Sequence, residues 1–369
     1  MFPGLAVSSV LVSRGHRAAV ILSGRAVEGE RSLADIPAGA ETLSVPASPF
    51  SPRRPLSMAK LGLSFLRARS RLAEFGPDAL LAMGSYTSAA PVLAARSLGI
   101  PVVLHEANAI PGSAVAFLAR FADAVCTSFP DMERRFRRGT VLRDTGLPLR
   151  ASFESGCGGT KAPPDAISVL VMGGSQGARD MNRAVVSAFA AAGKARGGAA
   201  FASLPPVRVV HLAGKANEEE IRALWRESGL PGSRFAVEVV GFEHDMARRY
   251  AEASVCISRA GASSCFELAL AGLPTFFVPL PGLARDHQTF NARSFAEKGA
   301  AEVVSQTELA GEEGAGKILE VLETARKGSE KAAGMRRRIM DMARPDAAGR
   351  VADAVEESAR RAASARRRK

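Results

Sequence analysis

Two glycine-rich turns carry the residues best suited to chemistry. The sequence GGSQGA (residues 173–178) follows an apolar run at 167–172, and RAGASS (259–264) follows another at 255–257. Glycine lets a backbone approach a diphosphate closely, while N–H groups and the positive end of the next helix dipole point at it. Closing a tight corner is the structural alternative. GGSQGA lacks the Gly-Lys-Ser/Thr ending of a P-loop and the spacing of G-x-G-x-x-G, which disfavours ATPase and dehydrogenase functions.

Polar side chains follow the second turn. Ser263 or Ser264 can cap the next helix, with Glu267 completing a capping box. Alternatively, Glu267 accepts hydrogen bonds from a ribose diol. Further on, DHQTFNA opens another helix, where Gln288 and Asn291 share one face and could read several hydroxyls of a sugar.

Strands and helices alternate along the chain, which predicts an α/β fold with parallel strands and crossover helices. The length of 369 residues suits two domains. Residues 149–165 lose periodicity and are rich in Gly, Pro and Ser, which predicts a linker. The expected strands are 18–22, 79–82, 102–104, 124–127, 167–172, 255–257 and 275–278, and the expected helices are 5–11, 91–98, 114–121, 179–191 and 266–271.

The first helix and strand form only the second half of such a strand, turn, helix, strand unit. In α/β nucleotide-binding domains a strand and a glycine-rich turn come before the helix. We therefore expect that a central strand is missing here, which would leave an unpaired buried edge and an apolar gap.

Composition narrows the function classes. No apolar stretch is long enough to span a bilayer and no basic signal-peptide start is visible, which favours the cytosol. Cys126, Cys157, Cys256 and Cys265 are widely spaced, which favours reduced thiols at buried or linker positions over a metal site. The net charge of +12 permits nucleic-acid binding, but aromatic residues make up only 6% and no zinc-finger or RNP-type motif is present.

The positive charge is concentrated in residues 51–71, SPRRPLSMAKLGLSFLRARSR, which contain six cations and no acid. The apolar side chains interleaved with them fit an interfacial segment on an anionic membrane. A solvated surface helix with a core stripe is the alternative. The candidate membrane-facing residues are Arg53, Arg54, Lys60, Leu63, Phe65, Leu66, Arg67 and Arg69.

Four motifs together resemble the MurG family of N-acetylglucosaminyltransferases, which complete the lipid-linked disaccharide of bacterial peptidoglycan. They are GGSQGARDMN, SRAGASSCFELALAGLP, PLPGLARDHQTFNA and GIPVVLHEANAIPGSAVAFLARFADAV, and the resemblance runs from Phe2 to about Leu309. It implies a GT-B fold, in which two Rossmann-like domains face each other across a cleft. The implied domains are 1–149 for acceptor and membrane, completed by a helix at about 345–360, and 150–344 for UDP-N-acetylglucosamine (UDP-GlcNAc), followed by a basic tail at 361–369.

The resemblance assigns roles to particular residues. Ser175, with Gln176 beside it, and Arg150 would contact the donor diphosphate, backbone groups at Glu243 would hold the uracil, and Glu267 the ribose. Gln288 and Asn291 would read the sugar, and Asn108 would reach it from the first domain. His105 and Glu106 would line the acceptor side, with a structural role as the alternative for His105, and Tyr86 would shape the acceptor pocket. The segment lining the nucleotide would be Ala262, Ser263, Ser264, Cys265, Phe266 and Glu267.

The implied reaction is an inverting transfer of GlcNAc to the 4-hydroxyl of undecaprenyl-diphosphate-linked MurNAc-pentapeptide, giving a β-1,4 linkage. The sequence has no D-x-D pair to hold a metal on the diphosphate, so we expect no metal and no other cofactor. The implied location is the cytoplasmic face of the inner membrane, as a peripheral protein. The resemblance also allows contacts with cell-wall or division proteins, and not with nucleic acid.

Three departures from the family pattern stand out. The family's GGTGGH, with its candidate base, would precede Phe2, so the catalytic residue is unassigned and we expect in-frame codons for it upstream of Met1. HEAN stands where HEQN is commoner, and GSYTSAAP (84–91) stands where GGYVSGP is usual. Two alternatives stay open: a catalytically dead donor-binding scaffold, and another GT-B transferase with a lipid acceptor.

Overall fold

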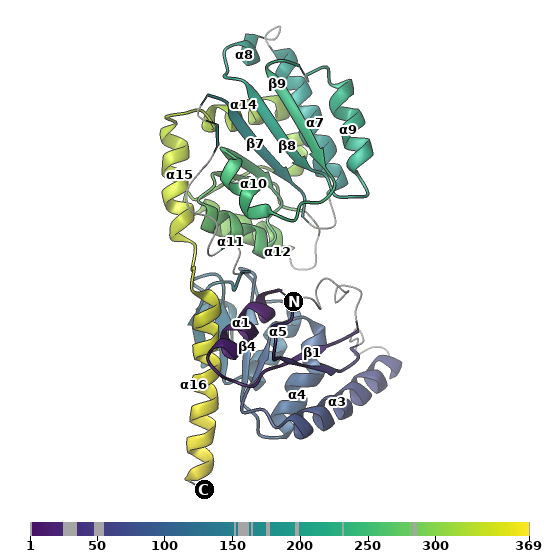
Figure 1. Cartoon of the computed structure of the whole chain (residues 1–369), viewed down its shortest axis with the longest axis vertical. Coiled ribbons are helices and arrows are strands. Elements are labelled where there is room, and N and C mark those ends of the chain that lie inside the picture. Colours follow the sequence, from purple (N-terminus) through teal and green to yellow (C-terminus); the bar gives the residue numbers. More distant parts are fainter. Residues whose placement is uncertain are drawn as a thin grey trace. The chain divides into compact units, whose positions relative to one another are not determined.

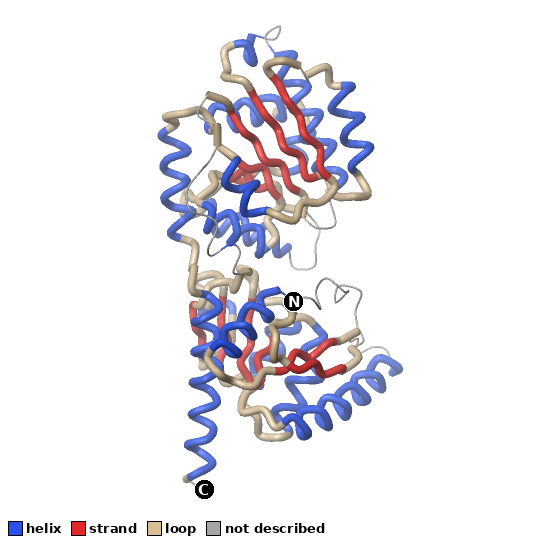
Figure 2. Tube along the Cα trace, in the orientation of Figure 1, coloured by secondary structure: helices blue, strands red, loops and turns tan. Residues whose placement is uncertain are grey.

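The chain divides into two compact units, each described here by itself (Figures 1 and 2). The N-terminal unit comprises Met1–Ala151 with Arg344–Lys369, and the C-terminal unit comprises Ser152–Ala343. The structure, a computed structural model, describes residues 2–24, 35–47, 55–150, 153, 162–163, 165–174, 178–195, 199–230, 232–280, 282 and 286–368.

A six-stranded parallel sheet forms the centre of the C-terminal unit, in the order β12-β11-β10-β7-β8-β9. The chain therefore starts in the middle at β7, moves outward to β9, and returns to the other side of β7 at β10. This is the strand order of a Rossmann fold, and the direction reverses between β7 and β10. The strands are β7 (Ile167–Met172), β8 (Val207–Leu212), β9 (Phe235–Val240), β10 (Val255–Ser258), β11 (Thr275–Phe277) and β12 (Glu302–Val303).

Two groups of helices pack on this sheet (Figure 1). Helix α7 packs with α9, α13 and α14, and α11 packs with α10, α12 and α15. Right-handed crossovers in opposite directions place the two groups on opposite faces, so the sheet is buried on both sides. The helices are α7 (Arg179–Lys194), α8 (Ala199–Ala202), α9 (Glu218–Glu227), α10 (Met246–Glu252), α11 (Ala262–Ala271), α12 (His287–Ala296), α13 (Gln306–Ala310), α14 (Gly314–Thr324) and α15 (Glu330–Asp341).

The N-terminal unit contains two parallel sheets, β1-β2 and β3-β4-β5-β6. The α/β class predicted from the sequence is thus confirmed in both units. The strands are β1 (Ala19–Leu22), β2 (Glu41–Ser44), β3 (Leu80–Ala82), β4 (Val102–Glu106), β5 (Ala124–Thr127) and β6 (Leu142–Asp144). The helices are α1 (Phe2–Ser13), α3 (Pro55–Phe75), α4 (Ala89–Ser97), α5 (Ser113–Leu118) and α16 (Ala347–Arg367), with short 3₁₀ turns η2 (Tyr86–Ser88), η3 (Ala119–Phe121) and η4 (Glu133–Arg135).

The last helix, α16, completes the N-terminal unit by packing on α1 and against β4 and β5. Val351 and Val355 are buried in one cluster with Val7 of α1. Arg14 adds charge-assisted contacts from its Nη1 to the carboxylates of Asp353 (2.7 Å) and Glu356 (2.9 Å). The apolar stripe of α16 therefore finds its core in the first unit.

A cavity of about 830 Å³ lies beside β1 and β3 and is lined also by α1 and α16. Within the described ranges β1 pairs only with β2 and β3 only with β4. Arg17 donates to the carbonyl of Phe75 at 2.8 Å, which brings the amino ends of β1 and β3 to the same end of the cavity. Both strands thus direct an unpaired edge toward this space.

Cys126, Cys256 and Cys265 are free and buried, as the sequence predicts, while Cys157 lies outside the described residues. Burial raises the pKa of the Cys126 thiol to about 12, so it stays protonated at neutral pH. None of the helices described is both long and apolar enough to cross a membrane.

Candidate functional site

The reversal of strand order in the C-terminal unit identifies the first candidate site. In open α/β sheets, ligands bind beyond the carboxyl ends of the two strands where the direction reverses. Here those strands are β7 and β10, so the turns after Met172 and after Ser258 adjoin. Both turns selected from the sequence therefore lie at one place in the fold.

Gly173 is required by the geometry of the first turn. A Cβ at this position would lie 2.8 Å from the backbone nitrogen of Ala178, and the next residue, Gly174, has φ +88°. The turn thus closes tightly against the start of α7. Ala178 is the N-cap of this helix and provides no side-chain cap. Ser175, the predicted diphosphate contact here, and Gln176, the substrate-binding candidate beside it, lie outside the described residues.

The second turn starts α11 without a capping box, which was one of the two alternatives for Ser263, Ser264 and Glu267. Gly261 occupies the N-cap and no side chain caps the helix, so neither Ser263 nor Ser264 does so. Ser263 is exposed and Ala262 and Ser264 are half-buried, whereas Cys265 and Phe266 are buried in the core. The N-terminus of α11 therefore keeps backbone N–H groups that the helix itself cannot satisfy.

Arg259, the residue directly after β10, places a positive charge beside this helix start. Its side chain is 4% exposed, with Nη1 donating to the Val278 carbonyl (2.9 Å) and Nη2 to Gln306 Oε1 (2.5 Å). Its Nε has no partner in the described part of the chain. Burial lowers the pKa of Arg259 to about 10, so the guanidinium stays charged at neutral pH. This arginine is the first residue of the RAGASS turn, but it was not among the residues predicted from the sequence.

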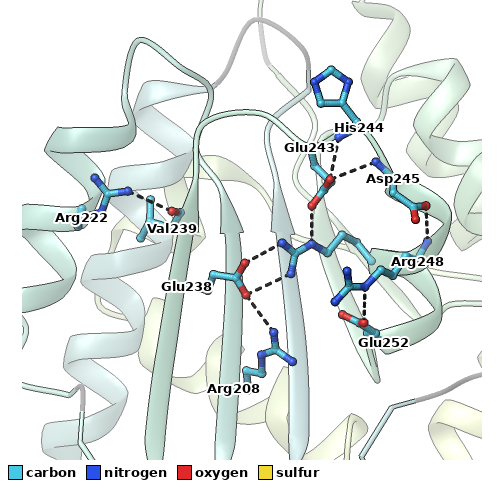
Figure 3. A network of polar contacts seen from close by, with 10 residues as sticks. Arg208, Arg222, Glu238, Val239, Glu243, His244, Asp245, Arg248 and Glu252 are labelled. Carbon is cyan, nitrogen blue, oxygen red and sulfur yellow. Dashed lines mark hydrogen bonds and ion pairs between the residues drawn. The ribbon is translucent and has the colours of Figure 1, made fainter.

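A network of charged side chains orders the loop around Glu243, between β9 and α10 (Figure 3). Glu243 accepts hydrogen bonds through Oε1 from the backbone N–H of His244 (2.8 Å) and Asp245 (3.1 Å), and through Oε2 from Arg249 Nε (2.7 Å). Burial alone would raise the pKa of Glu243, but these bonds outweigh it and the pKa is lowered. Arg249 also binds both carboxylate oxygens of Glu238, whose Oε2 accepts from Arg208 as well.

Glu267 lies in the second turn of α11 and is held from α10. Its Oε2 accepts a hydrogen bond of 2.8 Å from the hydroxyl of Tyr250, whose ring is buried. Tyr250 and Arg249 could not be found from the sequence, because their surroundings, YAEASVC and HDMARR, do not indicate which carboxylates they bind.

The two predicted sugar-binding residues of α12 both contact backbone. Gln288 Oε1 accepts from the N–H of Leu280 at 3.0 Å, and Asn291 Nδ2 donates to the carbonyl of Ala260 at 3.0 Å. Asn291 is 1% exposed, so it ties α12 to the turn before α11 from inside the unit. Asn291 therefore borders the turn before α11, whereas Gln288, the more accessible of the two, contacts the segment that follows β11.

In the N-terminal unit, the HEAN motif spans the end of β4, with His105 and Glu106 in the strand and the Glu106 carboxylate at the centre of the loop that follows. Glu106 is buried; its Oε1 accepts from the backbone and side-chain nitrogens of Asn108 (2.9 and 3.1 Å), and its Oε2 from the N–H of Gly112 (2.8 Å). His105 is also buried, with Nε2 3.1 Å from the Gly146 carbonyl, so Nε2 carries the proton. Burial lowers the pKa of His105 to about 4, and the ring is neutral.

The remaining predicted residues of this unit occupy its surface. Tyr86 begins η2 and is half-buried, directly after Ser85 with φ 68° and ψ 157°. Arg150 is exposed, and its guanidinium stacks over the ring of Phe2 at 3.7 Å.

Helix α3 presents the predicted membrane face in part. Leu63 and Leu66 are 52% and 61% exposed, and Lys60, Arg67 and Arg69 are exposed around them. Phe65 instead packs against the core of the unit, in the cluster that contains the buried residues Ala68 and Leu72 of the same helix. Arg53 and Arg54 lie outside the described residues.

Comparison with known proteins places the chain among glycosyltransferases. Residues 1–127 match the glycosyltransferase family 28 N-terminal domain, and residues 168–351 match the family 28 C-terminal domain. A protein of Halorhodospira halophila, named UDP-N-acetylglucosamine--N-acetylmuramyl-(pentapeptide) pyrophosphoryl-undecaprenol N-acetylglucosamine transferase, is 37% identical over 97% of this chain and 95% of its own. A protein of the same name from Solibacter usitatus is 34% identical over 98% and 93%. The crystal structure of Acinetobacter baumannii MurG superposes with a TM-score of 0.72 at 27% identity, covering 96% of this chain and 95% of that one.

Proposed function

Because the chain belongs to the MurG family of glycosyltransferases, we propose that it transfers GlcNAc from UDP-GlcNAc to the 4-hydroxyl of undecaprenyl-diphosphate-linked MurNAc-pentapeptide. The product is the β-1,4-linked, lipid-linked disaccharide from which peptidoglycan is built. The observation that carries this proposal is the meeting of two glycine turns, one buried arginine and two helix N-termini at the strand reversal of the C-terminal unit.

In this proposal the C-terminal unit binds the UDP-sugar. The N-termini of α7 and α11 and the charge of Arg259 favour a diphosphate at the strand reversal. Backbone groups of the loop at Glu243 hold the uracil, and the Glu267 carboxylate accepts hydrogen bonds from the ribose. Gln288 reads the sugar hydroxyls, and Asn291 acts with it by fixing the turn at Ala260. Ser175 and Gln176 complete the diphosphate contacts.

The chemistry proposed is a single displacement with inversion. The acceptor hydroxyl attacks the anomeric carbon from the face opposite UDP, the bond to the diphosphate oxygen breaks, and the hydroxyl proton passes to a base. Preorganised N–H groups and positive charge stabilise the leaving diphosphate more in the transition state than in the bound donor. His105 and Glu106 are both buried and hydrogen-bonded within the unit, so we assign them to holding the acceptor-side loops. The base stays unassigned.

We further propose that α3 rests on an anionic membrane surface from the cytoplasmic side, where a lipid-linked acceptor is found. Two exposed leucines at i, i+3 form an apolar centre, and the lysine and arginines beside them supply the attraction to acidic headgroups.

Donor binding and transfer can be tested with UDP-GlcNAc labelled in the sugar and a soluble analogue of the lipid-linked acceptor. We expect Glu267→Gln to lower kcat/KM by about 10- to 100-fold, because one charge-assisted hydrogen bond to the ribose is weakened. The exposed Glu330→Gln on α15 is the matched control and should leave kcat/KM unchanged. Tight UDP-GlcNAc binding without transfer would favour a donor-binding scaffold, and transfer to a different lipid would favour another acceptor class.

Membrane binding can be tested by flotation with vesicles containing phosphatidylglycerol. The double variant Leu63→Gln, Leu66→Gln should bind at least tenfold more weakly, since each half-exposed leucine buries further apolar area at the interface. Met340→Gln changes a side chain that is likewise 52% exposed but lies on α15, and should bind as the unmodified protein does. Equal loss in both variants, or none in either, would contradict the assignment of α3.

A further inference from the structure

Helix α10 is short, but two adjacent residues on it donate hydrogen bonds to carboxylates from two different segments. Arg249 binds Glu243 in the loop before the helix, and Tyr250 binds Glu267 of α11. Neither carboxylate is close to the other in sequence, and α10 packs directly against α11. A displacement of this one helix would therefore move both groups.

Arg249 is well placed to fix the conformation of the Glu243 loop. Its side chain is 12% exposed and that of Glu243 19%, so water screens the pair less than it would a surface ion pair. The second carboxylate, Glu238 on β9, receives Nη1 at 3.1 Å and Nη2 at 2.7 Å, which anchors the guanidinium to the sheet (Figure 3). The fixed guanidinium holds the Glu243 carboxylate in place. The carboxylate in turn holds the backbone at His244 and Asp245, whose N–H groups donate hydrogen bonds to it.

Tyr250 is equally constrained. Its side chain is 1% exposed, and its ring lies 6.0 Å from that of Phe153 between centroids. A buried aromatic ring has few alternative rotamers, so the hydroxyl donor that meets Glu267 Oε2 at 2.8 Å has a defined position. This hydrogen bond selects one orientation of the half-buried Glu267 carboxylate.

We propose that Arg249 and Tyr250 are positioning residues through which α10 sets the groups that recognise a nucleoside, Arg249 for the base and Tyr250 for the ribose. The inference rests on the proposed function, in which the Glu243 loop meets the uracil and Glu267 the ribose hydroxyls. It adds that selectivity for the base and for the sugar of the nucleotide depends on two side chains that touch neither.

Two binding ratios measured by calorimetry on the full chain test this inference. Ribose selectivity is the Kd of 2′,3′-dideoxy-UDP divided by that of UDP, and base selectivity is the Kd of CDP divided by that of UDP. Each ratio compares two ligands on one protein sample, so an inactive or unfolded fraction cancels. Tyr250→Phe keeps the ring and removes only the hydroxyl. Arg249→Gln removes the positive charge and the paired hydrogen bonds that the guanidinium donates to Glu238.

We expect Tyr250→Phe to lower ribose selectivity about three- to tenfold with a smaller effect on base selectivity, since one hydrogen bond that orients Glu267 is lost. Arg249→Gln should lower base selectivity by a similar factor. The neighbouring Arg248→Gln is the matched control, because Arg248 is 66% exposed and its side chain pairs with Glu252. In the double variant Tyr250→Phe, Glu267→Gln the ribose selectivity should equal that of Glu267→Gln alone, because Tyr250 acts through Glu267.

Two results would overturn the inference while leaving UDP binding intact: unchanged ribose selectivity in Tyr250→Phe, or equal shifts in Arg248→Gln and Arg249→Gln. If the unmodified protein bound UDP no better than CDP or inorganic diphosphate, the proposed function itself would fail, which is a separate outcome. Should one variant fail to fold, the other still decides whether α10 acts on the nucleoside.

Discussion

Replacing Ser85 by glycine should stabilise the protein. Ser85 has φ 68° and ψ 157°, a backbone region that essentially only glycine populates, and another residue held there costs about 1–3 kcal/mol. Its side chain is exposed, and the bond that closes η2 uses its backbone carbonyl, which accepts from Ser88 N–H at 3.2 Å. Glycine therefore loses no packing.

The net effect is smaller than the strain, because glycine also makes the unfolded chain more flexible. That term opposes the gain by about 0.4–1 kcal/mol, which leaves a stabilisation of up to about 2.6 kcal/mol. For a domain of this size each kcal/mol raises the melting temperature by about 2–4 °C, so the expected rise is up to about 10 °C.

Urea denaturation and calorimetry of Ser85→Gly measure the change, with Ser97→Gly as the control. Ser97 is the last residue of α4, where glycine lowers helix propensity and also removes the hydrogen bond from Ser97 Oγ to the Ala94 carbonyl (2.8 Å). This variant should therefore lose about 1–2 kcal/mol. A melting temperature that falls in both variants would refute the strain at Ser85, because the only remaining effect would be the flexibility of glycine.

Two further predictions concern the N-terminal unit. The pKa of His105 falls from its usual 6.5 to about 4 on folding, so between these pH values the unfolded chain binds more protons than the folded protein. Acidification from pH 6.5 to 4 should therefore lower the free energy of unfolding of the unmodified protein by up to about 3 kcal/mol more than that of His105→Gln. Denaturant titrations across this pH range measure the difference. Gly146→Ala should destabilise the protein by more than about 2 kcal/mol in the same assay, because Gly146 has φ +79° and a Cβ there would lie 2.4 Å from the Cβ of Arg344; an unaffected variant would show that the segment before α16 can move aside.

Several buried strands could be predicted from sequence because their apolar runs leave little choice. The strand β8, although largely buried, was not predicted, because Arg208 and His211 interrupt its apolar run VRVVHL. Residues 167–172 form β7 with every residue buried, and 275–278 were one residue too long for β11. The strand β2, with the sequence ETLS and mostly exposed side chains, carries no such pattern and was not predicted. A continuous apolar run indicates a parallel strand that is buried on both faces, whereas the formation of a short edge strand depends on pairing with its neighbour.

Caps illustrate a second limit. The pattern Ser263-Ser264 with Glu267 predicted a capping box at α11, yet the cap is Gly261 and Glu267 bonds to Tyr250. A true capping box occurs at α13, where Ser305 Oγ accepts from Glu308 N–H and the Glu308 carboxylate accepts from Ser305 N–H. Both sequences satisfy the local rule, and a tertiary partner decided between them.

Arg249 and Arg259 of the C-terminal unit were not predicted from the sequence, and their positive charges are compensated in different ways. Arg249 meets two carboxylates, so its charge is neutralised within the unit. Arg259 is more deeply buried, and its hydrogen bonds go to a carbonyl and an amide oxygen, both neutral. The Asp180 carboxylate acts on it through its electrostatic field, which works against the lowering of its pKa by burial. A buried cation with neutral partners is costly, and a bound anion removes most of that cost. Arg259 directly follows β10, one of the two strands at which the sheet order reverses. Its charge, which Asp180 offsets only in part, favours a diphosphate at that point, and this supports the proposed donor binding independently of any resemblance in sequence.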